Sequence, residues 1–189
     1  MLNQSHLLHG ERHSCDDLIA IFNRLFASRL NTILEKGGDE PLYSPAGAQC
    51  DRHRVVFKHD YFASALHEIA HWCIAGTKRR TQIDYGYWYA PDGRTTQQQR
   101  KFERVEVKPQ ALEWIFARAA GYKFTVSNDN LAAGETSNHP FELALYQQAL
   151  HYCKQGLPHR AELFRLALAE YYGANATLDG SQFGPVQCG

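Results

Sequence analysis

The stretch His67-Glu68-Ile69-Ala70-His71 lies within residues 61–75, a segment whose composition predicts a helix. On a helix, residues four positions apart lie on the same face, so His67 and His71 can offer two imidazole nitrogens to one metal ion. The apolar neighbours of this pair predict a half-buried helix, in which two imidazoles need a shared partner. The pentad therefore predicts half of a metal site. The alternative is a chance match to a short pattern, with the histidines forming a polar stripe.

The length and composition of the chain limit what kind of protein it is. A chain of 189 residues is long enough for one domain with a sizeable core. Hydrophobic residues make up 44% of the sequence, and twenty basic residues balance twenty acidic ones. This balance gives no reason to expect binding to nucleic acid or to a membrane surface. We expect a single metal-dependent domain over residues 1–189, with flexible ends at 1–13 and 174–189.

Five cysteines are scattered along the sequence without a C-x-x-C pair, and neither a secretory leader nor a long apolar run is found. An odd number of scattered cysteines favours reduced thiols. We therefore expect a cytoplasmic protein. Cys73 follows His71 by two residues, so on a helix it would point away from the histidine pair, and we interpret it as a packing residue.

The spacing of apolar residues predicts the elements around the pentad. Residues 14–35 have apolar side chains at intervals of three and four, which predicts an amphipathic helix. Residues 39–51 are rich in turn-forming residues and predict a loop, which leads into a short strand at 54–58. Together the elements predict an α+β fold, with several helices on a small sheet and a zincin-like metal-site helix. The further predicted elements are an aromatic strand at 83–89, a short strand at 124–126, and helices at 97–120, 141–155 and 160–172.

Two features of the later helices have a specific structural meaning. Pro109 either kinks one helix over 97–120 or begins a second helix after a short first one. The short connection at 156–158 favours antiparallel packing of the two helices that it joins.

A third metal ligand is needed, because two histidines alone bind a metal loosely and catalytic sites usually have three protein ligands. No histidine follows the pentad until His139, so the third ligand is a carboxylate or a distant histidine. Glu103, Glu106 and Glu113 lie on the predicted helix 97–120. At about 100° per residue, Glu106 and Glu113 lie near its apolar stripe and Glu103 points toward solvent. Helical phase alone does not choose between Glu106 and Glu113.

Three blocks of sequence occur in a specific order along the chain. They are His67-Glu68-Ile69-Ala70-His71-Trp72-Cys73-Ile74-Ala75-Gly76, then Tyr85-Gly86-Tyr87-Trp88-Tyr89 with Pro91-Asp92-Gly93-Arg94, then Phe102-Glu103-Arg104-Val105-Glu106-Val107-Lys108-Pro109-Gln110-Ala111-Leu112. In these blocks the chain resembles the bacterial elongation factor P hydroxylase family, from about Leu18 to Tyr172. The resemblance implies an enzyme that hydroxylates the lysine of elongation factor P that already carries a β-lysyl group.

The resemblance also implies a ligand set and a cofactor. Carried over residue by residue, the metal ligands are His67, His71 and Glu106, in a two-histidine, one-carboxylate arrangement like that of non-haem iron oxygenases. The implied metal is iron(II), with zinc possible in the isolated protein, and O₂ is the implied co-substrate. The chain is helix-rich, and its two histidines share a helix, unlike the strand-rich dioxygenases that use 2-oxoglutarate. We therefore expect no 2-oxoglutarate.

Glu68 is the candidate catalytic residue whose role depends on the reaction. In a zinc protease this glutamate would be the general base that activates water, whereas a hydroxylase has no such requirement. In a hydroxylase, Glu68 could orient a metal-bound water or an imidazole proton. The simplest alternative is a structural carboxylate.

A hydroxylase of this kind needs a channel for a long cationic side chain and a surface that binds the protein substrate. Aromatic ring faces attract ammonium groups, and a nearby carboxylate would supply a counter-charge. A half-buried strand that packs on the core is the alternative for the aromatic residues. The basic segment 78–80, with Arg94 and Arg100, is a candidate docking patch for elongation factor P, which is acidic as a family. The candidate substrate-binding residues are Asp84, Tyr85, Tyr87, Trp88 and Asp92.

Two other functions compete with hydroxylation. A zinc-dependent hydrolase or peptidase would use Glu68 as general base, which explains Glu68 better but leaves the second and third sequence blocks unexplained. A non-enzymatic module that binds a translation factor would have a structural metal. Structural sites normally have four protein ligands, and the sequence offers three good candidates.

Overall fold

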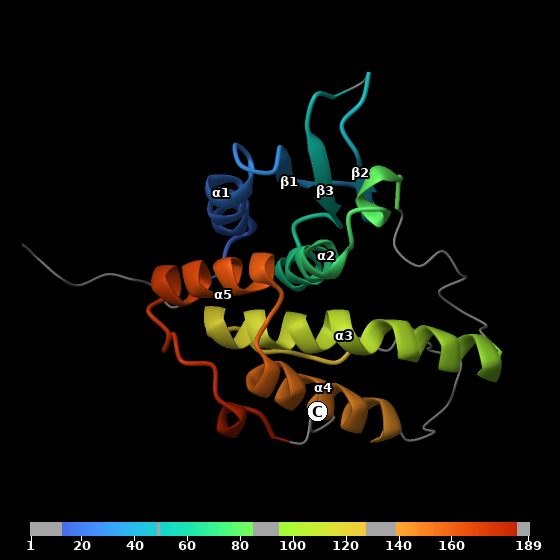
Figure 1. Cartoon of the computed structure of the whole chain (residues 1–189), viewed down its shortest axis with the longest axis vertical. Helices are drawn as coiled ribbons and strands as arrows, with labels where there is room; N and C mark the ends of the chain where they lie inside the picture. Colours follow the sequence, from blue (N-terminus) through green and yellow to red (C-terminus); the bar gives the residue numbers. More distant parts are fainter. Residues whose placement is uncertain (1–12, 49, 85–94, 128–138, 185–189) are drawn as a thin grey trace, which may run out of the picture.

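The computed structural model describes residues 13–48, 50–84, 95–127 and 139–184 of the chain. Within these residues, several α-helices pack with one small sheet, which confirms the predicted α+β class (Figure 1). No described helix combines the length and the apolar character needed to cross a membrane. The elements in chain order are α1 (Cys15–Phe26), β1 (Thr32–Lys36), β2 (Leu42–Ser44), β3 (His53–Phe57), α2 (Phe62–Ile74), η1 (Arg79–Thr81), α3 (Thr96–Ala120), α4 (His139–Gln155), α5 (His159–Tyr172) and η2 (Gly180–Gln182).

The sheet has the strand order β1-β3-β2, with β1 parallel and β2 antiparallel to the central strand β3. The second half of β3 is buried at Val55, Val56 and Phe57. Helix α1 packs on β1, and α2 packs on β3. The predicted strand at 54–58 is therefore confirmed, and it holds the helix that carries the pentad against the sheet.

The predicted helix over 14–35 is wrong in its second half. Helix α1 ends at Phe26, and Asn31 has a φ of 49°, a left-handed conformation that stops a helix. Thr32 and Leu34 then alternate with less buried residues along β1. Apolar spacing cannot predict this change, because the hydrogen bonds of β1 come from β3, which lies about twenty residues later in the chain.

Three other local predictions fall on short segments. The loop predicted at 39–51 contains a strand, β2, which forms because it pairs with β3. Residues 124–126 form no strand. Of the strand predicted at 83–89, Asp84 forms an isolated bridge with Tyr43, and residues 85–94 lie outside the described part of the chain.

Helix α3 is one continuous helix of 25 residues with Pro109 inside it. Thr95 caps its first turn, and Gly121, with a φ of 65°, ends it. Helices α4 and α5 both pack on α3, on opposite sides of it, instead of packing mainly against each other as predicted (Figure 1). Helix α3 thus lies at the centre of the molecule and also packs against α2.

The segment after α5 returns to α3. Phe183 is buried, and its ring packs edge-on against the Trp114 ring of α3, with 5.1 Å between the ring centroids. The described residues share one hydrophobic core, which includes the inward faces of α1, α2, α3 and α5.

Candidate metal centre

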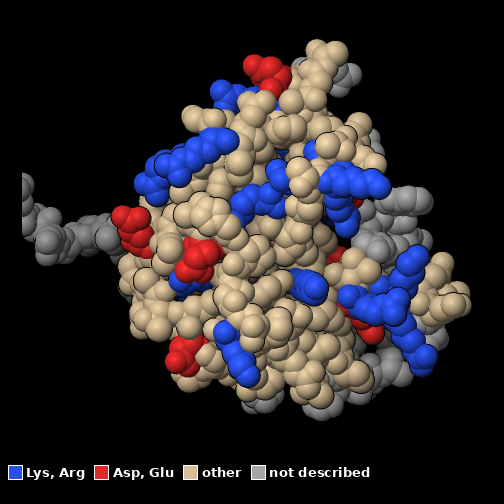
Figure 2. All heavy atoms as spheres, in the orientation of Figure 1, with Lys and Arg blue, Asp and Glu red and all other residues tan. Residues whose placement is uncertain are grey.

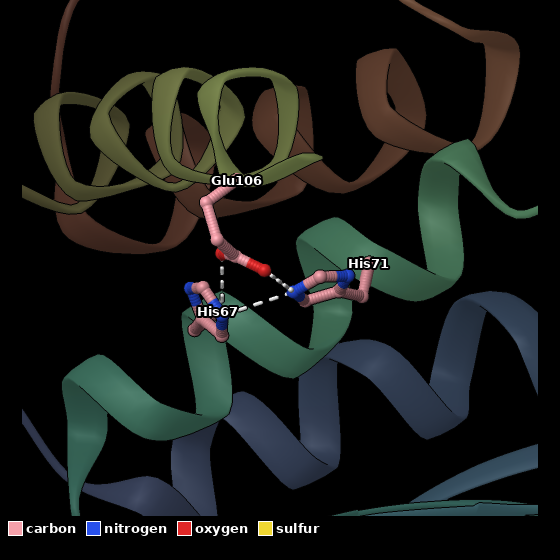
Figure 3. Close-up of side chains that lie close together, drawn as sticks. All are labelled: His67, His71 and Glu106. Carbon is pink, nitrogen blue, oxygen red and sulfur yellow. Dashed lines mark hydrogen bonds and ion pairs between the residues drawn. The ribbon is translucent and has the colours of Figure 1, made fainter. Parts of the chain in front are cut away.

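Two histidines of α2 and one glutamate of α3 converge where the two helices pack together (Figure 3). The Nε2 atoms of His67 and His71 lie 3.0 Å apart. Each Nε2 lies 3.4 Å from an oxygen of Glu106, Oε2 for His67 and Oε1 for His71. The two histidines meet because they are one helical turn apart, and Glu106 joins them from the facing helix. One possible ligand atom from each residue lies within 4.8 Å of the others.

The Glu106 carboxylate is buried at this point, with 3% of the residue exposed, and its Oε2 has no hydrogen-bond partner. Burial raises the pKa of Glu106, but hydrogen bonding and charge from His71 and charge from His67 lower it below its usual value. The carboxylate is therefore ionised at neutral pH. A buried charge with an unbonded oxygen is costly unless a cation accompanies it. Two imidazole nitrogens and a carboxylate oxygen form a donor set that suits iron or zinc.

Glu113 lies on the same face of α3, two turns after Glu106, and supports the cluster from outside. Its Oε2 lies 2.9 Å from Nδ1 of His67, and only 5% of the residue is exposed. With Nδ1–H donated to Glu113, Nε2 of His67 faces the cluster. Burial lowers the pKa of His67, but the hydrogen bond and charge of Glu113, together with the charge of Glu106, raise it to about 10.

The three candidate glutamates of α3 thus occupy different places. Glu106 lies in the cluster, Glu113 contacts the outer nitrogen of His67, and Glu103 accepts a hydrogen bond from Gln99 at 3.0 Å. Sequence reasoning missed the supporting position of Glu113. The signal was available, because a seven-residue spacing places Glu106 and Glu113 on one helical face.

Glu68 lies beside the cluster and is not one of its three members. It lines a pocket together with His71 and Asp84, between α2 and the sheet. Burial raises the pKa of Glu68, and the nearby histidines act in the opposite direction. Asp84 forms an ion pair with Arg79, with 2.5 Å between Oδ2 and Nε. The other predicted substrate-binding residues, Tyr85, Tyr87, Trp88 and Asp92, lie outside the described residues.

Arg160 of α5 holds the end of α2 that carries His71. Its Nη2 donates to the backbone oxygens of Trp72, Cys73 and Ala75 at 2.9, 3.0 and 2.6 Å. The guanidinium also lies 4.7 Å from the centre of the Trp72 ring. Helix ends leave carbonyl oxygens without partners, and a residue almost ninety positions later in the chain binds them here. No local sequence pattern indicates this contact.

The described elements define a helix-rich α+β protein with a candidate metal centre between α2 and α3. Comparison with known proteins gives a more specific result. Residues 21–183 match the family described as elongation factor P hydroxylase. The chain is 48% identical over 171 residues to the elongation factor P lysine hydroxylase of Haemophilus influenzae. The aligned residues cover 90% of this chain and 96% of that relative. The chain therefore belongs to the elongation factor P hydroxylase family, which confirms the resemblance seen in the sequence.

Proposed function

We propose that this protein hydroxylates a lysine side chain of elongation factor P, the lysine that carries a β-lysyl group, in the cytoplasm. Membership of the family supports the reaction and the protein substrate. The observation that supports a metal-dependent reaction is the convergence of His67, His71 and the buried, partly unbonded carboxylate of Glu106.

In this proposal His67, His71 and Glu106 hold iron(II), although zinc could bind the same donors in the isolated protein. The bound metal would supply the O₂ chemistry that oxidation of an unactivated C–H bond requires, with electrons from a separate reductant and without 2-oxoglutarate. The two histidines present Nε2, and Glu113 keeps the Nδ1 proton of His67 directed away from the cluster. Three protein donors leave positions for O₂ and substrate.

The proposed binding of elongation factor P depends on the attraction between opposite charges. Lys and Arg side chains gather over η1 and the N-terminal half of α3, on the right of the face shown in Figure 2. An acidic elongation factor P could bind this surface and direct its lysine toward the cluster. Asp84, together with Tyr85, Tyr87, Trp88 and Asp92, remains our candidate set for binding the lysine side chain.

The direct test is incubation of the protein with iron(II), O₂, a reductant and β-lysylated elongation factor P. Mass spectrometry should show the gain of one oxygen atom on the substrate. His67→Ala and His71→Ala should lose bound metal and activity together, while the surface variant Glu170→Gln should retain both. Absence of the mass gain with every reductant tried would reject the proposed function.

A further inference from the structure

A pocket next to the metal cluster has a size and a lining that fit one small polar group. It lies between α2 and the region of β2, β3 and η1, and His71 borders both the pocket and the cluster. Its cavity volume is about 30 Å³, which exceeds the roughly 10–15 Å³ that a single water molecule needs. A group of that size, such as the ammonium group at the end of an alkyl chain, could enter it.

The charges in the pocket leave one carboxylate without a partner. Asp84 is paired with Arg79. Glu68 forms no hydrogen bond or ion pair with any described residue, although it is only partly exposed. A half-buried carboxylate in this position gains stability when a cation binds beside it.

We propose that this pocket binds one ammonium group of the substrate lysine side chain, and that Glu68 is its counter-charge. This inference rests on the proposed function and names the part of the substrate that the pocket recognises. Two sources can supply the group: the ε-ammonium of an unmodified lysine, or an ammonium of the β-lysyl extension. An ammonium held beside His71 would fix the position of the attached alkyl chain relative to the cluster. Glu68 is then a specificity residue and not a general base.

A small anion is the other occupant to consider, because Arg80 also lines the pocket and its Nε has no hydrogen-bond partner. Two observations favour a cation. Glu68, the carboxylate without a partner, lies on the same helix as His67 and His71 and lines the pocket. Tyr43 also lines the pocket, and aromatic faces attract ammonium groups.

The test measures binding without turnover. The zinc-loaded protein is titrated, without O₂, with three forms of elongation factor P: unmodified, β-lysylated, and β-lysylated with the extension amines acetylated. Glu68→Gln should weaken binding of the β-lysylated form about 10- to 100-fold if the extension supplies the ammonium, and should leave binding of the acetylated form unchanged. If the ε-ammonium of lysine is bound instead, Glu68→Gln weakens the unmodified form. The matched variant Glu170→Gln, exposed on α5, should bind all three forms like the wild type.

Several results would overturn the inference. Equal binding of all three forms by wild type and Glu68→Gln would do so. So would competition by butyrate and not by butylammonium, a measurement on the wild type that does not depend on a variant folding. A fall in kcat of Glu68→Gln with unchanged KM would indicate a general base. Binding that depends on Glu68 in a protein that hydroxylates nothing would support the pocket and reject the proposed function.

Discussion

The three glutamates of α3 are chemically identical, but their surroundings predict different effects of the same substitution. Glu106→Gln removes the charge in the cluster and should abolish tight metal binding, whereas Glu103→Gln changes a residue that contacts Gln99 and should retain metal and activity. Metal content after dialysis, measured by elemental analysis, checks both. Full metal content in Glu106→Gln would show that another group is the third ligand.

The Glu113→Gln variant tests whether Glu113, which lies outside the cluster, orients the imidazole of His67. An amide oxygen can still accept from Nδ1 of His67 but carries no charge, so metal affinity should fall about 10- to 100-fold without being lost. Competition with a chromophoric chelator measures this affinity. The metal affinity of Glu113→Ala should be lower still. A metal affinity equal to that of the wild type in both variants would show that Glu113 does not orient His67.

The raised pKa of His67 predicts how metal affinity depends on pH. In the metal-free protein His67 is protonated up to about pH 10, and a metal binds its nitrogen only after the proton leaves. Apparent zinc affinity should therefore increase as the pH rises from about 6.5 toward 10, by up to about tenfold per unit. Conversely, the protonated pair with Glu113 stabilises the metal-free fold below pH 6.5, and this contribution is lost as the pH rises through about 10.

Calorimetric titration with zinc in two buffers of different ionisation enthalpy should detect the release of this proton. The Glu113→Gln variant provides the control: it keeps all three candidate ligands but removes the charge that raises the pKa of His67, so it should release fewer protons. An affinity that does not change with pH would contradict the raised pKa.

At the residue scale, the sequence and the resemblance named the three side chains that converge in the structure, and that these side chains bind a metal stays a prediction. The contact of Glu113 with His67 was missed. Helical phase placed Glu106 and Glu113 on the buried face, and the resemblance selected Glu106. Phase could not separate them, because their difference depends on where α3 crosses α2, and that crossing is set by packing along both helices.

At the scale of elements, Arg160 of α5 stabilises the C-terminal end of α2. Arg160→Ala leaves the backbone oxygens of Trp72, Cys73 and Ala75 without this donor. We expect a loss of about 2–3 kcal/mol in the free energy of unfolding and weaker metal binding, because His71 lies in the same final turn. Thermal denaturation with and without zinc checks this. Arg160→Lys should recover part of the stability, and a wild-type melting temperature for Arg160→Ala would contradict the role.

The elements that the sequence predicted well are those whose signal is local. Helix α2, which carries the pentad, and helix α3, which contains Pro109, have apolar residues at a spacing that matches their buried faces. Strands β1 and β2 were missed because each is short and is stabilised mainly by pairing with β3. Because the strands pair with segments distant in the sequence, the order of the strands in the sheet could not be predicted from the sequence.

At the scale of the whole molecule, the basic surface over η1 and α3 predicts salt-dependent substrate binding. Lys78→Glu and Arg100→Glu should each raise KM for elongation factor P at low ionic strength with a smaller effect on kcat. The difference from wild type should shrink near about 1 M salt, where charges are screened beyond about 3 Å. Steady-state assays at two salt concentrations check this. Lys154→Glu on α4 is the control, and an equal effect of all three variants would argue against a localised docking surface.

The contact between Arg160 and the end of α2 also affects when the candidate metal centre can form during synthesis of the chain. A ribosome synthesises α1, the sheet and α2 well before it reaches residue 160. Until then the last carbonyl groups of α2 lack the donor that binds them in the finished protein, and the facing glutamates of α3 also come later. Nascent chains that end before α5 should therefore bind metal poorly, so the centre matures late in synthesis. Under the proposed function, we expect metal to bind only after α5 has been synthesised.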